Sequence, residues 1–162
     1  MKDLAGVLPN AEKFTRGHYS MEDLAREARI RGFNRIVVVS GRKGNPGIMR
    51  VYEVEEGSLA HIASLKIKGV ALSRELRRPL PRFKPRGMIV DVDGSPLSDL
   101  VSDILVRSFK ARLYEDPRER EIVARLEGAD DFVILEFFAK EGPVGPRLKV
   151  APTRGFTSGD KG

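Results

Sequence analysis

The chain contains no cysteine and no tryptophan, and two of its 162 residues are histidine. Without cysteine it can form neither a disulfide nor a thiolate zinc site, and we expect an intracellular, cytoplasmic setting. No run of eighteen apolar residues occurs, and no charged segment followed by an apolar one opens the chain. The sequence therefore predicts neither a membrane span nor a secretory signal.

Groups of residues that carry chemistry are also scarce. His18 and His61 fall in different predicted elements, and the paired acids at 91/93 and 130/131 have no histidine or cysteine companion. Metal binding and nucleophilic catalysis both need several such groups together. We expect a protein that is not an enzyme and that uses no cofactor, metal or small-molecule substrate.

Positive charge is abundant and unevenly distributed. The net charge of +6 comes from residues 1–73 with 12 basic and 8 acidic side chains, residues 74–87 with 6 and 1, and residues 88–162 with 11 and 14. The first two segments are basic and the third is acidic. Such asymmetry indicates that one face of the molecule meets a polyanion, for which nucleic acid is the natural candidate.

The most basic stretch, residues 74–87, reads RELRRPLPRFKPRG. Its three prolines, at 79, 81 and 85, remove backbone donors and fix φ, so we predict an extended connector here. We call this stretch the strap. It separates a half-domain at 1–73 from a second at 88–151, and residues 152–162 are predicted to form a flexible tail.

The two halves resemble each other in order and pattern. Setting Asp3 on Asp103 and Gly44 on Gly142 aligns helix with helix, strand with strand and one Gly/Pro turn with the other. A repeat with a period of about a hundred residues indicates a duplicated supersecondary unit. We predict an α/β (α+β) fold of two pseudo-repeated half-domains, each with a mixed sheet packed by helices. The predicted helices are 2–8, 20–31, 96–109 and 117–126, and the predicted strands are 11–15, 36–40, 48–54, 60–72, 88–92, 111–114, 132–139 and 147–151.

The repeat predicts that one strand is missing from the first half. The second half opens with a strand at 88–92 before its first helix, whereas the first half begins inside the corresponding helix. Residues 36–40 form a β-branched run typical of a central strand covered on both faces. Either the chain start has been placed too late, or another segment must cover an exposed sheet edge.

Two loops carry candidate RNA contacts. In the loop 41–47, glycines allow close backbone approach to a phosphate and Arg42 and Lys43 add charge, although a plain hairpin turn would use the same glycines. Before the helix at 20–31, Arg16 is placed to meet a phosphate. Tyr19 could stack on a base or could serve as a hydrophobic staple for that helix.

The residues LPNAEKF, RG before SMEDL, the turn KGNPG and the strand end LSREL resemble, in that order, the Brix-domain family of ribosome-biogenesis proteins in its short archaeal form. The resemblance covers about residues 2–151 as a single domain. Family members usually begin with a strand and a turn rich in Ser, Thr and Arg, which this chain lacks. The resemblance implies two α/β halves, each similar to the anticodon-binding domain of class II aminoacyl-tRNA synthetases, and a role in rRNA processing and subunit assembly without catalysis.

The leading hypothesis is an RNA-binding assembly factor for precursor ribosomal RNA, with ribosomal or other assembly proteins as further partners. A tRNA-binding module and an adaptor that binds protein alone stay open as alternatives. Shape and charge should supply most of the affinity, so specificity should come from the RNA fold or from partners. The predicted RNA-binding residues are Arg16, Arg42, Lys43, Arg74, Arg77, Arg78, Arg82, Lys84 and Arg86.

Overall fold

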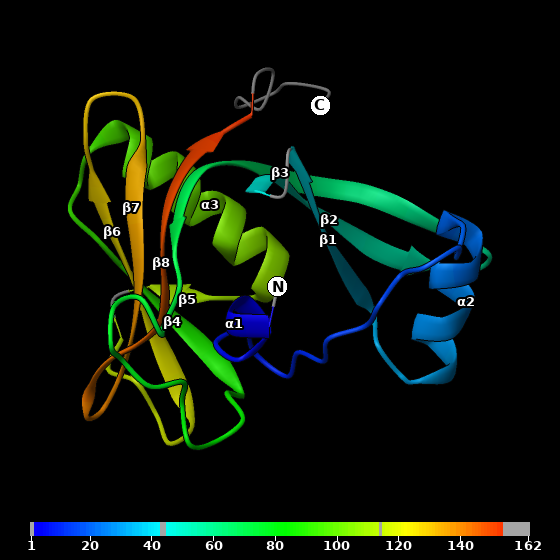
Figure 1. The fold of residues 1–162 in the computed structure, drawn as a ribbon, viewed down its shortest axis with the longest axis horizontal. Helices are drawn as coiled ribbons and strands as arrows, with labels where there is room; N and C mark the ends of the chain where they lie inside the picture. Colours follow the sequence, from blue (N-terminus) through cyan, green and yellow to red (C-terminus); the bar gives the residue numbers. More distant parts are fainter. Residues whose placement is uncertain (1, 43–44, 114, 154–162) are drawn as a thin grey trace.

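A computed structural model, which describes residues 2–42, 45–113 and 115–153, gives a mixed α+β fold built on one sheet. Its eight strands lie in the order β1-β2-β3-β8-β7-β6-β4-β5, and two of the helices, α2 and α3, are longer than one turn (Figure 1). In chain order the elements are α1 (Lys2–Ala5), α2 (Met21–Ile30), β1 (Arg35–Arg42), β2 (Asn45–Glu55), β3 (Ser58–Ala71), β4 (Gly87–Val92), α3 (Pro96–Phe109), β5 (Arg112–Leu113), β6 (Glu121–Gly128), β7 (Val133–Ala139) and β8 (Gly142–Pro152).

The sheet joins the two halves of the sequence through one pair of strands. β3, the last strand of the first half, pairs antiparallel with β8, the last strand of the second half. Outward from this seam, β2 and β1 follow on one side and β7 and β6 on the other, all antiparallel. On the second side the sheet continues into β4 and β5, and β4 runs parallel to both of its neighbours.

The core lies between α3 and the sheet. On α3, Val101, Ile104 and Leu105 are buried against strands of both halves, and the cluster includes Leu65 of β3 and Leu148 of β8. Burying such side chains supplies most of the free energy of folding, so the seam is also where the two halves are held together. Within the described residues, no helix is long and apolar enough to cross a membrane.

The predicted start of α2 is confirmed. The Ser20 hydroxyl accepts a hydrogen bond from the Asp23 amide at 3.1 Å, and the Ser20 amide donates to the Asp23 carboxylate at 3.0 Å. This reciprocal pair satisfies two amides that the first turn of a helix leaves free. Leu24, Ala25 and Ala28 form the buried face of α2.

The helix predicted at 117–126 is wrong, because β6 occupies most of that range. Ile122, Ala124 and Leu126 are buried while Arg125 and Glu127 are exposed, which is the two-residue period of a strand. Ile122 and Leu126 are also four residues apart, so the same side chains fit a helical stripe. Pairing with β4 and β7 decided between the two.

Two strand predictions in the first half also need correction. Residues 11–15 form no strand. The run at 36–40 does form β1, but β1 lies at an edge of the sheet and not at its centre. At the other end of the chain, β8 extends one residue into the predicted tail, since Pro152 pairs with Leu65.

Candidate nucleic-acid interface

The strap is fixed to the body of the protein by backbone hydrogen bonds. Its Pro79 carbonyl accepts from the Gly145 amide at 2.8 Å, its Pro85 carbonyl accepts from the Asn10 amide at 2.7 Å, and the Arg86 amide donates to the Arg120 carbonyl at 2.7 Å. The strap is therefore a positioned segment and not a loose linker. It connects β3 to β4 along the lower left of the view in Figure 1.

The first part of the strap is not extended. Residues 72–78 form hydrogen-bonded turns, in which the Leu76 amide donates to the Leu72 carbonyl at 3.1 Å and the Arg78 amide to the Ser73 carbonyl at 3.0 Å. The prolines begin after this turn, and from 79 onward the chain has no helical hydrogen bond because prolines cannot donate one.

In the second part of the strap, exposed basic residues alternate with less exposed ones. Arg82, Lys84 and Arg86 are exposed, while Phe83 packs against the core and Pro85 is buried. All three cations are therefore accessible to solvent, while the residues between them anchor the segment to the protein. This row of three exposed charges, at every second residue of the sequence, suits a phosphate backbone.

The other strap residues differ in accessibility. Arg74 and Arg77 are exposed on the turn at 72–78. Arg78 is not: its guanidinium is 3.1 Å from the Glu136 carboxylate on β7, and its side chain is 12% exposed. The structure thus gives Arg78 a partner within the protein.

Arg16 lies among exposed aromatic side chains before α2. Its guanidinium Nε donates to the Tyr19 carbonyl at 3.0 Å. The ring of Tyr19, 41% exposed, meets the ring of Phe14, 37% exposed, edge to face at 5.2 Å. Arg31 lies over the Phe14 ring at 4.9 Å.

Lys43 and the Arg42 side chain lie outside the described residues, so their predicted role stays a prediction. The strand that precedes Lys43 is described: β1 ends at Arg42, which pairs with Asn45 of β2.

A groove of about 820 Å³ brings Arg16 and Arg86 to one part of the molecule. It runs beside β1, and its walls also include residues 8–14, the end of α3 and the start of β4. Lys13, Arg35 and Lys110 line it as well, and sequence reasoning missed all three. Their charges are separated by up to about a hundred residues, so no local pattern pointed to them.

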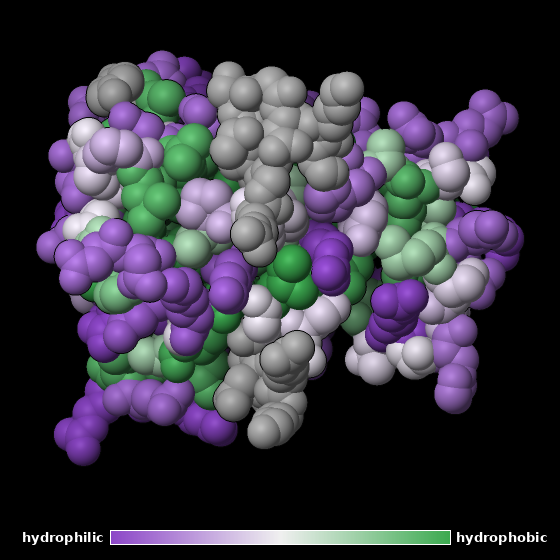
Figure 2. Space-filling view, turned by 90° about the horizontal axis from the view of Figure 1, so that it is seen from above, coloured by the Kyte–Doolittle hydropathy of each residue, from purple (hydrophilic) through white to green (hydrophobic). Residues whose placement is uncertain are grey.

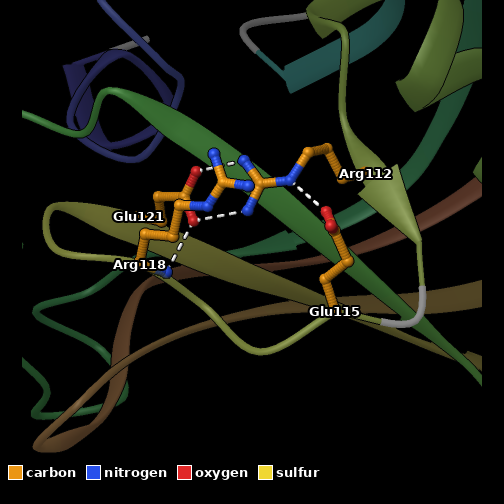
Figure 3. Close-up of polar contacts among 4 residues, drawn as sticks. All are labelled: Arg112, Glu115, Arg118 and Glu121. Carbon is orange, nitrogen blue, oxygen red and sulfur yellow. Dashed lines mark hydrogen bonds and ion pairs between the residues drawn. The ribbon is translucent and has the colours of Figure 1, made fainter.

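Another residue that lines the groove, Arg112, is paired with two acids (Figure 3). Its guanidinium forms a bidentate ion pair with Glu121, in which Nη2 is 2.8 Å from Oε1, and its Nε contacts Glu115. The Arg118 amide donates to the same Glu121 carboxylate at 2.6 Å. Hydrogen bonding from Arg112 is the main cause that lowers the pKa of Glu121, and the acids raise the pKa of Arg112. Arg112 therefore links β5 to β6. Because the two acids neutralise its positive charge, it is poorly suited to bind a phosphate.

The surface outside the groove is mixed in character. Seen from above, hydrophilic residues cover much of the molecule, with hydrophobic areas on both its left and right parts (Figure 2). Among the described residues, no group of three or more histidine, cysteine, aspartate or glutamate side chains could hold a metal ion.

The comparison with protein-family models finds no match. Curated proteins do match: a protein of Aeropyrum pernix, named "Probable Brix domain-containing ribosomal biogenesis protein", is 45% identical over 156 residues, which are 93% of this chain and 85% of that protein. A protein of Pyrococcus horikoshii with the same name is 26% identical, over 91% of this chain and 74% of its own length.

A solved structure agrees with these relatives. The crystal structure of a probable ribosomal biogenesis protein from Aeropyrum pernix K1 matches with a TM-score of 0.88 and 43% identity, over 94% of this chain and 87% of that one. Identity at this level over nearly the whole chain indicates membership of the same family and not only a shared fold. The chain belongs to the Brix-domain family of ribosomal biogenesis proteins.

Proposed function

We propose that this protein takes part in ribosome biogenesis in the cytoplasm by binding precursor ribosomal RNA, and that it does so as an assembly factor without catalysing a reaction. The relatives named as ribosomal biogenesis proteins support the process. The main support for RNA as the ligand is the row of exposed cations formed by Arg82, Lys84 and Arg86.

The strap is suited to phosphates because its cations are pre-arranged. Backbone hydrogen bonds at Pro79, Pro85 and Arg86 hold the segment, so binding costs little backbone entropy. Charged contacts of this kind carry no sequence information, and specificity must come from RNA shape or from protein partners. Arg74 and Arg77 extend the row, while Arg78 supports it through Glu136.

The aromatic pair before α2 offers a second type of contact. Phe14 and Tyr19 are exposed beside Arg16 and Lys13, and rings next to cations are the usual platform for unpaired bases. This observation favours Arg16 as an RNA contact over a purely structural residue. It also suggests that the bound RNA includes single-stranded nucleotides.

The first test is crosslinking of the tagged protein to RNA in cells, followed by sequencing. Enrichment of precursor ribosomal RNA is the expected result, and the reads would locate the site. Enrichment of tRNA would replace the proposal with a tRNA-binding module. Absence of any enriched RNA would favour an adaptor that binds protein alone.

A matched pair of variants tests the strap itself on the RNA fragment that the crosslinking enriches. Lys84→Glu should weaken binding about tenfold. It should also make the slope of log K against log salt less steep by about 1, because one phosphate contact is lost. Lys140→Glu makes the same charge change at an exposed position between β7 and β8. It should leave affinity and slope near those of the unmodified protein, and equal losses in the two variants would contradict a role for the strap.

A further inference from the structure

In the first half, helices cover both faces of the sheet. The core cluster on one face includes Val51 and Leu65 together with buried residues of α3. α2 contacts β1, β2 and β3, but its buried residues, Leu24, Ala25 and Ala28, do not belong to that cluster. Figure 1 shows β1 and β2 between α3 on one side and α2 on the other. α2 therefore covers the face opposite α3.

In the second half, the described helices cover one face only. Ile122 and Leu135 belong to the core cluster that includes α3, so α3 packs on their side of β6 and β7. The first half places α2 just before β1, whereas the residues before β6, 115–120, form no helix. The other side of β6, β7 and β8 therefore has no described helix on it. We call this side the outer face, and it consists of Val123, Arg125, Glu127, Ile134, Glu136, Phe138, Arg147 and Lys149.

Several side chains of the outer face are apolar. Phe138 pairs with Val123 across β7 and β6, Ile134 lies on the same face of β7, and all three are half-buried. β6 also runs parallel to β4, and parallel strands usually have both faces of the sheet covered. A face that met only water would carry polar residues at these positions. The three apolar residues therefore indicate a surface that a second layer covers.

Charged side chains of the outer face lie against aromatic rings. The Arg125 guanidinium is 4.1 Å from the centre of the Phe138 ring, and Nζ of Lys149 is 5.2 Å from that of Phe132. Arg125 is also 3.6 Å from the Asp91 carboxylate. The hydrocarbon parts of such long side chains add to an apolar surface while their charges stay in water. The outer face thus combines apolar area with charges that can pair with a partner.

Positive charge is concentrated where the outer face meets the seam between β8 and β3. Four exposed cations lie on these two strands: Arg147, Lys149, Lys66 and Lys68. Asp131 is 2.8 Å from Lys68, and no ion pair among the described residues engages the other three. A partner on this face should therefore bring acidic side chains to its β8 side.

We propose that the outer face binds one amphipathic α-helix of a second protein, with its apolar stripe on Val123, Ile134 and Phe138. Acidic side chains on one flank of this helix would pair with Arg147 and Lys149. The occupant is a helix because α2 fills the corresponding position in the first half. A helix of ten residues, like α2, is about 15 Å long, which is enough to cross three strands spaced about 4.8 Å apart.

A protein suits this surface better than RNA does. The outer face carries Glu127 and Glu136, and Asp91 lies beside it next to Arg125. These carboxylates would repel phosphates, whereas a helix can pair with charges of both signs. The site goes beyond the proposed function, because it lies apart from the exposed cations of the strap and requires no RNA.

The first experiment places a photo-crosslinking residue, benzoylphenylalanine, at position 134 of the tagged full chain in its own cells. The crosslinks should concentrate on one protein, in a segment with apolar residues three and four positions apart and acidic residues beside them. The control carries the same group at position 30, since Ile30 is 74% exposed on α2. Crosslinks from position 134 to RNA alone, to no protein, or to the same proteins as from position 30 would overturn the proposal.

A synthetic peptide of the crosslinked segment then tests the binding mode on the purified protein. The peptide should gain helical circular dichroism on binding. Ile134→Thr should weaken binding about tenfold, because buried apolar area is lost while threonine keeps the β-branched shape that suits a strand. Ile30→Thr, the same change on α2, should leave the affinity unchanged within about twofold. Equal affinities of the two variants, or binding without a gain of helix, would contradict the proposal.

Melting temperatures show whether each protein is folded before it is used. If the group at position 134 disturbs folding, position 127 replaces it, since Glu127 is exposed and pairs with Ile134 across β6 and β7. None of these measurements involves RNA, so a failure of this proposal is distinguishable from a failure of the proposed function.

Discussion

Gly145 of β8 lies next to both the strap and Val7. Its amide donates to Pro79 of the strap, its φ is +69°, and a Cβ built there would lie 2.4 Å from Cγ1 of the fully buried Val7. The position therefore requires glycine both for backbone conformation and for space.

Gly145→Ala should lower the free energy of unfolding by about 3 kcal/mol, since backbone strain and overpacking of Val7 add. Gly57→Ala is the matched control, because Gly57 has φ +74° and nothing within 4 Å of the new Cβ. Gly57→Ala should lower the free energy of unfolding by about 1 kcal/mol. Urea titration of both variants measures the two values. Equal costs in the two variants would show that Val7 moves aside freely.

Glu121 supports the sheet through charge. Its side chain is 8% exposed, and its Oε2 would lie 2.6 Å from a Cβ at residue 87, so a side chain there would push the carboxylate away from its present position beside Arg112. Hydrogen bonding from Arg112 lowers the pKa of Glu121 from its ordinary value of 4.5. A lowered pKa in the folded state stabilises the protein above the unfolded pKa, and this stabilisation is lost as pH falls through the folded pKa.

Glu121→Gln should therefore lower the melting temperature by about 5 °C at pH 7. As the pH falls below the ordinary pKa of 4.5 the difference should shrink, because the unfolded chain takes up the proton more readily than the folded protein, whose Glu121 pKa is lowered. Calorimetry from pH 7 to pH 3 measures both effects. A difference that stays constant over this range would mean that packing, and not charge, sets the cost.

At the scale of elements, the strap combines binding and structural residues in one short sequence. Arg77 and Arg78 are neighbours and equally basic, yet Arg77 is exposed and Arg78 is paired with Glu136 on β7. The turn at 72–78 produces this difference, since it directs one side chain outward and the next toward the sheet.

Arg78→Met should lower the free energy of unfolding by about 1 kcal/mol through the lost partly buried ion pair. Arg77→Met, at the neighbouring exposed site, should leave stability unchanged within about 0.5 kcal/mol. Urea unfolding of the two variants measures the contrast. If Arg77→Met were the more destabilising change, the assignment of the two side chains would be wrong.

At the scale of the whole molecule, charge divides the protein into a basic part and an acidic part. Residues 1–87 carry the positive excess and residues 88–162 the negative one. If RNA contacts the strap and the region before α2, the protected surface should be confined to the basic part.

Lysine acetylation with and without the enriched RNA measures this footprint. Lys13 and Lys84 are exposed and should become several-fold less reactive in the complex, because phosphates cover them. Lys140, exposed in the acidic part, should keep its reactivity. Protection of Lys140 with free Lys13 and Lys84 would place the RNA on the opposite part.

The sequence by itself determined the features whose causes are local. The Ser20 cap lies within four residues, and the prolines of the strap act on their own backbone. The basic character of the strap and the family resemblance also required no knowledge of contacts. The half-domain boundaries and the likeness of each half to anticodon-binding domains stay predictions.

The tertiary structure decided the features that depend on distant partners. Residues 121–128 became a strand because β4 and β7 pair with them, although their apolar spacing also fitted a helix. β1 lies at an edge although its composition resembles that of a central strand. Arg78 became structural because Glu136, 58 residues away, reaches it. Periodicity reports what a segment can bury, whereas the partner that buries it is set by the packing of the whole chain.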